Sequence, residues 1–151
     1  MKRIFTPHGF TLTEIMIAIA IIAVLAGITI PSVIKYRENA RIAKAIMEIN
    51  NVSQMVLESF YATKAYPNSL SEVGMGGLTD PWGNAYEYLP MTTANKGQCR
   101  KDRNLNPLNT DFDLYSKGPD GQSVAPLTAK ASHDDIVRAN NGAFVGLGSK
   151  Y

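Results

Sequence analysis

The sequence has few of the residues that small proteins use to build a disulfide, a zinc centre or a nucleophilic active site. Cys99 is the only cysteine among the 151 residues, so no disulfide can form within the chain. The two histidines, His8 and His133, with this one cysteine, are too few for the usual zinc sites. His133 stands next to Asp134, but no nucleophile-elbow sequence accompanies the pair. We therefore expect that the protein is not an enzyme.

The chain also lacks an excess of charge of either sign outside its first residues. The formal net charge is +2, and Lys2 and Arg3 supply two of the 15 basic residues. A chain that began at Phe10 would carry 13 basic residues against 13 acidic ones. Domains that bind nucleic acid present a basic surface, so we expect no nucleic-acid partner.

A long uncharged run, Ile15–Ile30, follows the basic N-terminus and predicts a membrane-associated helix over residues 10–34. Three interpretations are open. The run could belong to a secretory signal peptide that is cut near Ala26, or to an ordinary single-pass anchor. It could also belong to a segment that is processed before the run rather than after it.

Glu14 separates these interpretations, because a carboxylate in a membrane helix costs about 2.5–3.5 kcal/mol at the bilayer centre and less near the interface. A signal peptide or a plain anchor gains nothing from that cost. Cleavage after Gly9 would create an ammonium group on Phe10, four residues from the carboxylate. A neighbouring copy of the chain could offer its own amine instead. We therefore favour processing before the run.

Residues Gly9–Glu14, followed by the run IMIAIAIIAVLAGITIPS, resemble the processing and methylation motif of type IV pilins and type II secretion pseudopilins. The resemblance implies that a prepilin peptidase cuts after Gly9 and methylates Phe10. It also implies that Glu14 pairs with the amine of an adjacent subunit during assembly. The family carries a proline at the place of Pro31, where the helix loosens in filaments, so Pro31 is assigned an assembly role. Two separate helices broken at Pro31 are the alternative.

A helical pattern resumes after Pro31 and predicts an amphipathic continuation over residues 35–64. The apolar positions that recur on one helical face are Ile42, Ile46, Ile49, Val56 and Phe60. The helix is expected to end near Lys64, because Tyr66 and Pro67 continue it poorly. The predicted organisation is a leader at 1–9, a membrane and filament-core helix at 10–34, the continuation at 35–64, and a globular region at 65–151 packed on that continuation.

The C-terminal region predicts a small antiparallel sheet. Alternating residues indicate strands at 85–89 and 111–115, and a third strand is expected at 143–147. Asp80–Gly83 has the sequence of a type I turn, and residues 92–110 are expected to form an irregular loop. The predicted fold class is therefore α+β, with a long N-terminal helix packed on a small sheet and an irregular C-terminal loop.

Two stretches in this region, DPWGNAYEYL and DFDLYSKGPDG, are similar to the major pseudopilin of type II secretion, as is the segment Ser132–Ile136. The resemblance implies a calcium loop. Side-chain oxygens would come from Asp120, Asp134 and Asp135, and carbonyl oxygens from Lys117, Gln122 and Ser132. Calcium would hold a loop that has little apolar content and no disulfide. The alternative is that Asp134 and Asp135 cap a helix over residues 136–140.

The function implied by the resemblance is structural. The chain would be a subunit of a type II secretion pseudopilus, made with the help of prepilin peptidase, an inner-membrane platform with its ATPase, and minor pseudopilins. It would be a single-pass protein of the bacterial inner membrane, with its C-terminal domain in the periplasm, and would polymerise with itself. Two alternatives remain open. The first is a type IV pilin for adhesion, motility or DNA uptake, although many such pilins close their C-terminal loop with a disulfide. The second is a membrane-tethered calcium-binding or hydrolytic domain.

Overall fold

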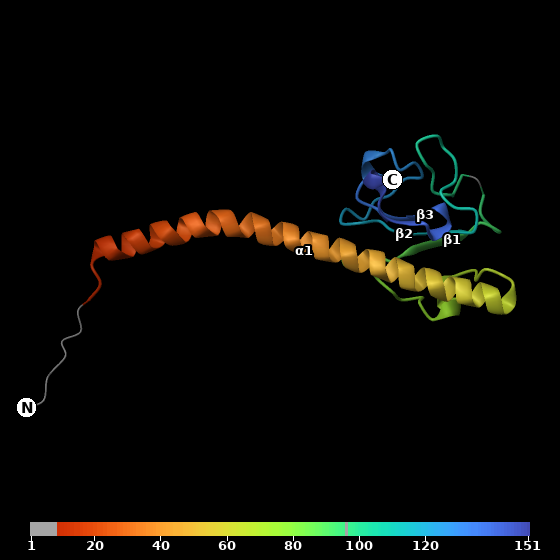
Figure 1. Ribbon diagram of the computed structural model, residues 1–151, viewed down its shortest axis with the longest axis horizontal. Helices are drawn as coiled ribbons and strands as arrows, with labels where there is room; N and C mark the ends of the chain where they lie inside the picture. The colour runs from red at the N-terminus through yellow and green to blue at the C-terminus, as the bar shows by residue number, and fades with distance from the viewer. Residues whose placement is uncertain (1–8, 96) are drawn as a thin grey trace, which may run out of the picture. The chain divides into compact units, whose positions relative to one another are not determined.

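The computed structural model describes residues 9–95 and 97–151 of the protein (Figure 1). The chain divides into two units, one that ends at Glu38 and one from Asn39 to Tyr151. The predicted leader, apart from Gly9, lies outside the described residues, and so do Lys2 and Arg3.

One helix, α1 (Leu12–Thr63), contributes residues to both units. It continues through Pro31 although proline has no N–H to donate to the carbonyl of Gly27. The alternative of two helices broken at Pro31 is therefore wrong, while an assembly role for Pro31 stays a prediction. The predicted C-terminal end of the helix is confirmed, because Thr63 is its last residue and Lys64 takes the left-handed conformation with φ 61°.

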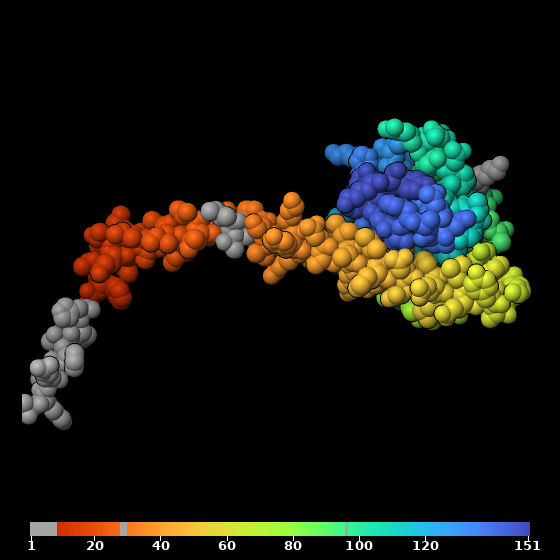
Figure 2. All heavy atoms as spheres, in the orientation of Figure 1, coloured from red at the N-terminus to blue at the C-terminus, as the bar shows by residue number. Residues whose placement is uncertain are grey.

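The second unit is built around the part of α1 that follows Glu38. Ala45, Ile49, Val52 and Val56 are spaced by four, three and four residues, and all four are buried. The predicted residues Ile42 and Ile46 are partly buried beside this line. The opposite side of the segment is exposed and carries polar residues together with Met47 and Tyr61. In the space-filling view the C-terminal part of α1 lies against the rest of the second unit along one side (Figure 2). The predicted amphipathic continuation is thus confirmed, and its most buried line passes through Ala45 and Val52.

Four short strands form one antiparallel sheet in the order β1-β2-β3-β4. Their bounds are Glu87–Pro90 for β1, Phe112–Ser116 for β2, Ile136–Ala139 for β3 and Phe144–Leu147 for β4. β1, β2 and β4 lie close to the three predicted strands, and the α+β class is confirmed. The helix considered for residues 136–140 is wrong, because residues 136–139 form β3 between two neighbouring strands.

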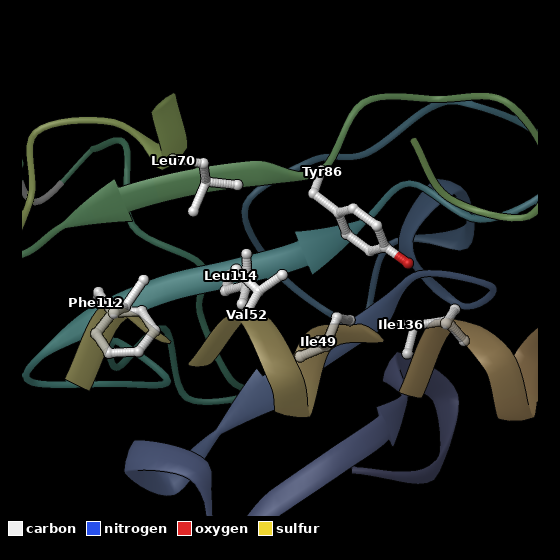
Figure 3. Packing of buried hydrophobic residues seen from close by; sticks show 9 residues of the cluster. Ile49, Val52, Leu70, Tyr86, Phe112, Leu114 and Ile136 are labelled. Carbon is white, nitrogen blue, oxygen red and sulfur yellow. The ribbon is translucent and has the colours of Figure 1, made fainter. Parts of the chain in front are cut away.

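The sheet packs on α1 through side chains that point from the strands toward the helix (Figure 3). Phe112 and Leu114 of β2 and Ile136 of β3 are buried against Ile49 and Val52. Burying an apolar side chain of this size contributes about 1.5–3 kcal/mol. This contact therefore covers the apolar face of the helix and fixes the place of the sheet on it.

The Asp80–Gly83 turn is formed and connects the core to the C-terminal loops. The N–H of Gly83 donates to the carbonyl of Asp80 at 3.0 Å, and the Asp80 carboxylate accepts from Asn84 N–H at 2.8 Å and Ser116 Oγ at 2.5 Å. Trp82 of the same turn is partly buried against the core. Residues 92–110, apart from residue 96, contain no helix or regular strand, as expected for an irregular loop.

Candidate assembly site and C-terminal loop

Gly9 and Phe10, the predicted processing residues, precede α1 and are exposed. The side chain of Phe10 is 84% exposed, and a Cβ atom added to Gly9 would meet nothing within 4 Å. The peptide bond between them is therefore open to approach by another protein. Cleavage and methylation themselves stay predictions.

Thr11 and Glu14 form a reciprocal cap at the N-terminus of α1. Glu14 Oε2 accepts hydrogen bonds from the N–H of Thr11 and from Thr11 Oγ1, both at 2.8 Å. In return, the N–H of Glu14 donates to Thr11 Oγ1 at 3.2 Å. This is the capping box of the sequence pattern Thr-x-x-Glu. The role of Thr11 was not predicted from the sequence, although the three-residue spacing between a threonine and a glutamate indicates a capping box.

The cap offsets part of the cost of placing the Glu14 carboxylate in a membrane helix. A cap contributes about 0.5–2 kcal/mol to helix stability, so a plain anchor would recover part of the cost of the carboxylate. Both bonds from Thr11 use Oε2, so the cap does not occupy Oε1. The same carboxylate can therefore cap its own helix and face an amine of another subunit.

The first unit presents a continuous apolar surface beyond the cap. An 18-residue window of α1 near its N-terminus has a mean hydropathy of 2.6, and none of it is buried within the chain. The large apolar side chains of α1 that are exposed between Leu12 and Ile34 are Leu12, Ile15, Met16, Ile17, Ile19, Ile21, Ile22, Val24, Leu25, Ile30, Val33 and Ile34. Each would gain about 1.5–3 kcal/mol on full transfer from water to an apolar environment. This helical surface is therefore suited to lipid or to the helices of other copies, and the cost of one carboxylate is small beside that gain.

The C-terminal loop is closed around a buried ion pair between Arg100 and Asp135. The guanidinium Nη2 of Arg100 donates to Asp135 Oδ2, and both side chains are almost completely inaccessible. Nη1 donates to Ser123 Oγ at 2.5 Å and also to the carbonyl of Val124. Ser123 Oγ donates to the same Asp135 oxygen at 2.6 Å. One cationic group thus joins three points of the segment 122–135.

Burial has the largest effect on the pKa of the two carboxyl groups near Arg100. It raises the pKa of Asp135, while the Ser123 hydroxyl and the Arg100 guanidinium lower it. Burial also raises the pKa of Asp113, against the lowering effect of its hydrogen bonds from Asn109 Nδ2 and the Arg100 N–H. The charged form of a buried carboxylate is costly, so Asp135 depends on its cationic partner.

The predicted calcium ligands lie in two different environments. Asp120, Gln122 and Asp134 line a shallow hollow, which Lys130 and His133 also border. Asp120 Oδ1 accepts from the N–H of Gln122 at 2.8 Å, and Asp134 Oδ2 accepts from the N–H of Asp120 at 3.4 Å.

Asp135 differs from these two aspartates, because its side chain is already engaged. At Ser132 and Lys117 the hydroxyl bonds to the backbone of Val124 and the Nζ pairs with Glu87 at 2.5 Å, but these side-chain bonds leave the predicted carbonyl ligands unaffected. The carboxylate of Asp135 is bound by Arg100 inside the loop. No group of three or more acidic, histidine or cysteine side chains with metal-binding geometry occurs among the described residues. The donor set therefore does not fit a calcium ion held jointly by all three aspartates, and the calcium site stays a prediction.

The loop that carries Asp120 is held by a close backbone contact. Gly118 has φ 64°, and a Cβ atom there would lie 2.4 Å from the carbonyl oxygen of Asp134. Asn84 Nδ2 donates to the Gly118 carbonyl at 2.9 Å and connects this loop to the Asp80 turn. DPWGN and KGPDG, the two stretches whose sequences resemble the major pseudopilin, are therefore in contact in space.

Known proteins resemble the chain both in its N-terminal motif and over most of its length. Residues 6–30 match the family described as the prokaryotic N-terminal methylation motif. The chain is 30% identical over 143 residues to the type II secretion system core protein G of Escherichia coli (strain K12), a match that covers 81% of this chain and 88% of that protein. It is 32% identical over 140 residues to a fimbrial protein of Neisseria meningitidis serogroup A, covering 85% and 81%. Core protein G of Pseudomonas aeruginosa is 29% identical over 141 residues, covering 76% and 84%. No solved structure matches significantly.

Proposed function

Because the chain belongs to the family of type IV pilins and type II secretion pseudopilins, we propose that it is a structural subunit of a type II secretion pseudopilus. Its relatives are filament subunits, which confirms the expectation that it is not an enzyme. The alternative of a membrane-tethered hydrolytic domain is therefore wrong.

The observation that carries the filament part of this proposal is the combination of an exposed Gly9–Phe10 bond, a capped Glu14 and an uncovered apolar helix. Prepilin peptidase would release the amine of Phe10, and the helix would stay in the inner membrane until assembly. A platform protein and its ATPase would then draw the subunit out of the bilayer. The apolar surfaces would pack together in the filament, and Glu14 would set the register by pairing with an amine.

The C-terminal region supports the part of the proposal that assigns the filament to type II secretion. The stretches around Asp80 and Gly118, which carry the similarity to pseudopilins, pack on each other. Cys99 is the only cysteine, so the loop cannot be closed by a disulfide as in many pilins. The domain would lie in the periplasm, and minor pseudopilins would join the filament.

A type IV pilin is the second candidate, favoured by the fimbrial protein of Neisseria meningitidis at 32% identity. Deleting the gene separates the two functions. The secretion proposal predicts that folded exoproteins accumulate in the periplasm while surface pili and twitching stay normal. Loss of pili or twitching with normal secretion would contradict it and support the pilin. Complementation with the unaltered gene is the control.

A further inference from the structure

The guanidinium group of Arg100 lies in a cage of oxygen atoms inside the C-terminal loop. Its hydrogen bonds reach the hydroxyl of Ser123, the carbonyl of Val124 and the carboxylate of Asp135. A hydroxyl, a carbonyl and a carboxylate are the kinds of oxygen that calcium also uses. Arg100 therefore presents a positive charge to donors suited to a hard cation.

The cage spans the segment that calcium was expected to close. Ser123 and Val124 begin this segment and Asp135 ends it, so one group joins both ends. Asp135, one of the three predicted carboxylate ligands, is fully buried and bound by the guanidinium. A calcium ion held by Asp135 would have to compete with Arg100 for this carboxylate.

Two unpartnered buried atoms support the same pairing. Among the described residues, Arg100 Nε and Asp135 Oδ1 are buried polar atoms without a hydrogen-bond partner. They are the remaining donor and acceptor of one ion pair, whose other bond joins Nη2 to Oδ2. A guanidinium group can bind a carboxylate side-on through Nε and one Nη atom. A small adjustment of this pair would satisfy both atoms without any further ligand.

The residues around Arg100 hold it in place. The ring of Tyr115 lies 4.5 Å from the guanidinium carbon, within range of a cation–π contact. The N–H of Arg100 donates to Asp113 Oδ2 at 2.6 Å. The N–H of the next residue, Lys101, donates to Ala125 O at 2.8 Å, and its carbonyl accepts from Leu127 N–H at 3.0 Å. Residues 100 and 101 therefore lie along the segment 122–135 and hold it through several hydrogen bonds.

We infer that the guanidinium of Arg100 acts as a built-in cation that closes the C-terminal loop in place of a calcium ion. The loop carries its own charge compensation, so folding of the domain does not depend on calcium. The inference does not depend on whether the filament serves secretion or a surface pilus.

Melting of the full chain in detergent micelles tests the inference, with the fluorescence of Trp82 as the signal. Trp82 is the only tryptophan and packs against the core of the second unit, so it reports unfolding of that unit. The unaltered protein should melt at the same temperature, within about 1 °C, in millimolar calcium and in excess chelator. A drop of about 5 °C or more on chelation would overturn the inference, since 1 kcal/mol corresponds to about 2–8 °C for domains of 60–250 residues.

Variants of Arg100 give the second part of the test. Arg100→Met keeps most of the apolar stem but removes the charge, and should lower the melting temperature by at least about 5 °C in calcium and chelator alike. Arg100→Lys keeps a charge with fewer donors, so its melting temperature should lie between those of the unaltered protein and Arg100→Met. It also provides a folded variant if Arg100→Met does not fold. Arg103→Met, at an exposed position nearby, is the matched control and should melt normally. Normal melting of Arg100→Met would overturn the inference.

Discussion

Glu14 Oε2 accepts two hydrogen bonds from Thr11, each of 2.8 Å, and the two residues together cap the N-terminus of α1. The carboxylate therefore stabilises its own helix before any second subunit is present. In a filament its negative charge would also pair with the amine of Phe10 from a neighbour. These two roles depend on different properties of the side chain, since the cap needs a hydrogen-bond acceptor and the pairing needs a charge.

Glu14→Gln separates the two roles, because glutamine can form the capping box but carries no charge. We expect Glu14→Gln subunits to reach the membrane in normal amounts and to assemble at least about tenfold less, which corresponds to ~1.4 kcal/mol. The measurement is the amount of subunit in filaments sheared from cells, against total subunit. Thr11→Ala is the matched variant, since it weakens the cap and keeps the charge, and it should still assemble. Filament yields that are normal in Glu14→Gln and reduced in Thr11→Ala would assign Glu14 to the cap alone.

Tyr86, the residue before β1, is joined to α1 by a hydrogen bond from its hydroxyl to Glu48 Oε2 at 2.6 Å. Burial and the neighbouring Glu48 carboxylate raise the pKa of Tyr86 well above its usual value. The neutral hydroxyl is thus favoured in the folded state, so its stabilising effect is complete below pH about 10 and is lost at higher pH. Tyr86→Phe should lower the free energy of unfolding by about 0.5–1.5 kcal/mol at pH 7.

The difference between Tyr86→Phe and the unaltered protein should shrink as the pH rises above about 10. Chemical unfolding at pH 7 and at several alkaline pH values, followed by Trp82 fluorescence, measures it. Tyr61→Phe is the control, because Tyr61 is 67% exposed on the far side of the helix and its loss of a hydroxyl should change little. A difference that stays constant up to the alkaline limit of folding would contradict this prediction.

Gly118 allows the close approach of its loop to Asp134. Because φ is 64° and an added Cβ would lie 2.4 Å from the Asp134 carbonyl, Gly118→Ala should destabilise the second unit by about 1–3 kcal/mol. Gly77→Ala is the matched control, since nothing lies within 4 Å of a Cβ there, and it should stay within about 0.5 kcal/mol. Equal stability of the two variants in chemical unfolding would show that the contact is not required.

The sequence predicts the elements whose signals are local. The uncharged run and the helical spacing of Ile42, Ile46 and Ile49 predict α1, and its end at Thr63 agrees with the expected boundary. β3 was missed because all four of its residues are buried, so its sequence shows no alternation of apolar and polar residues. Arg138 in this strand looks like a surface residue, yet it is buried and bound to both oxygens of Asp111 at 2.8 and 2.6 Å.

Among the candidate site residues, too, those with a local sequence signal could be predicted and those without one could not. Glu14 is found from the sequence because one carboxylate beside an apolar run is conspicuous, while Thr11 needed attention to a three-residue spacing. Arg100 was missed because its partner Asp135 lies 35 residues away, and no local pattern relates the two. Interactions between distant loops depend on the fold, so the closure of the C-terminal loop is visible only in the structure.

The central claim is that the chain is cut after Gly9 and modified at Phe10 before assembly, and the mass of the N-terminus of the protein purified from its own membranes tests it most directly. We predict a peptide that begins with Phe10 and carries one additional methyl group on its amine. A Gly9→Ala variant, purified in the same way, should keep the first nine residues. An unaltered protein that still begins with Met1, or that begins after Ala26, would contradict the account and return the apolar helix to a plain anchor or a signal peptide.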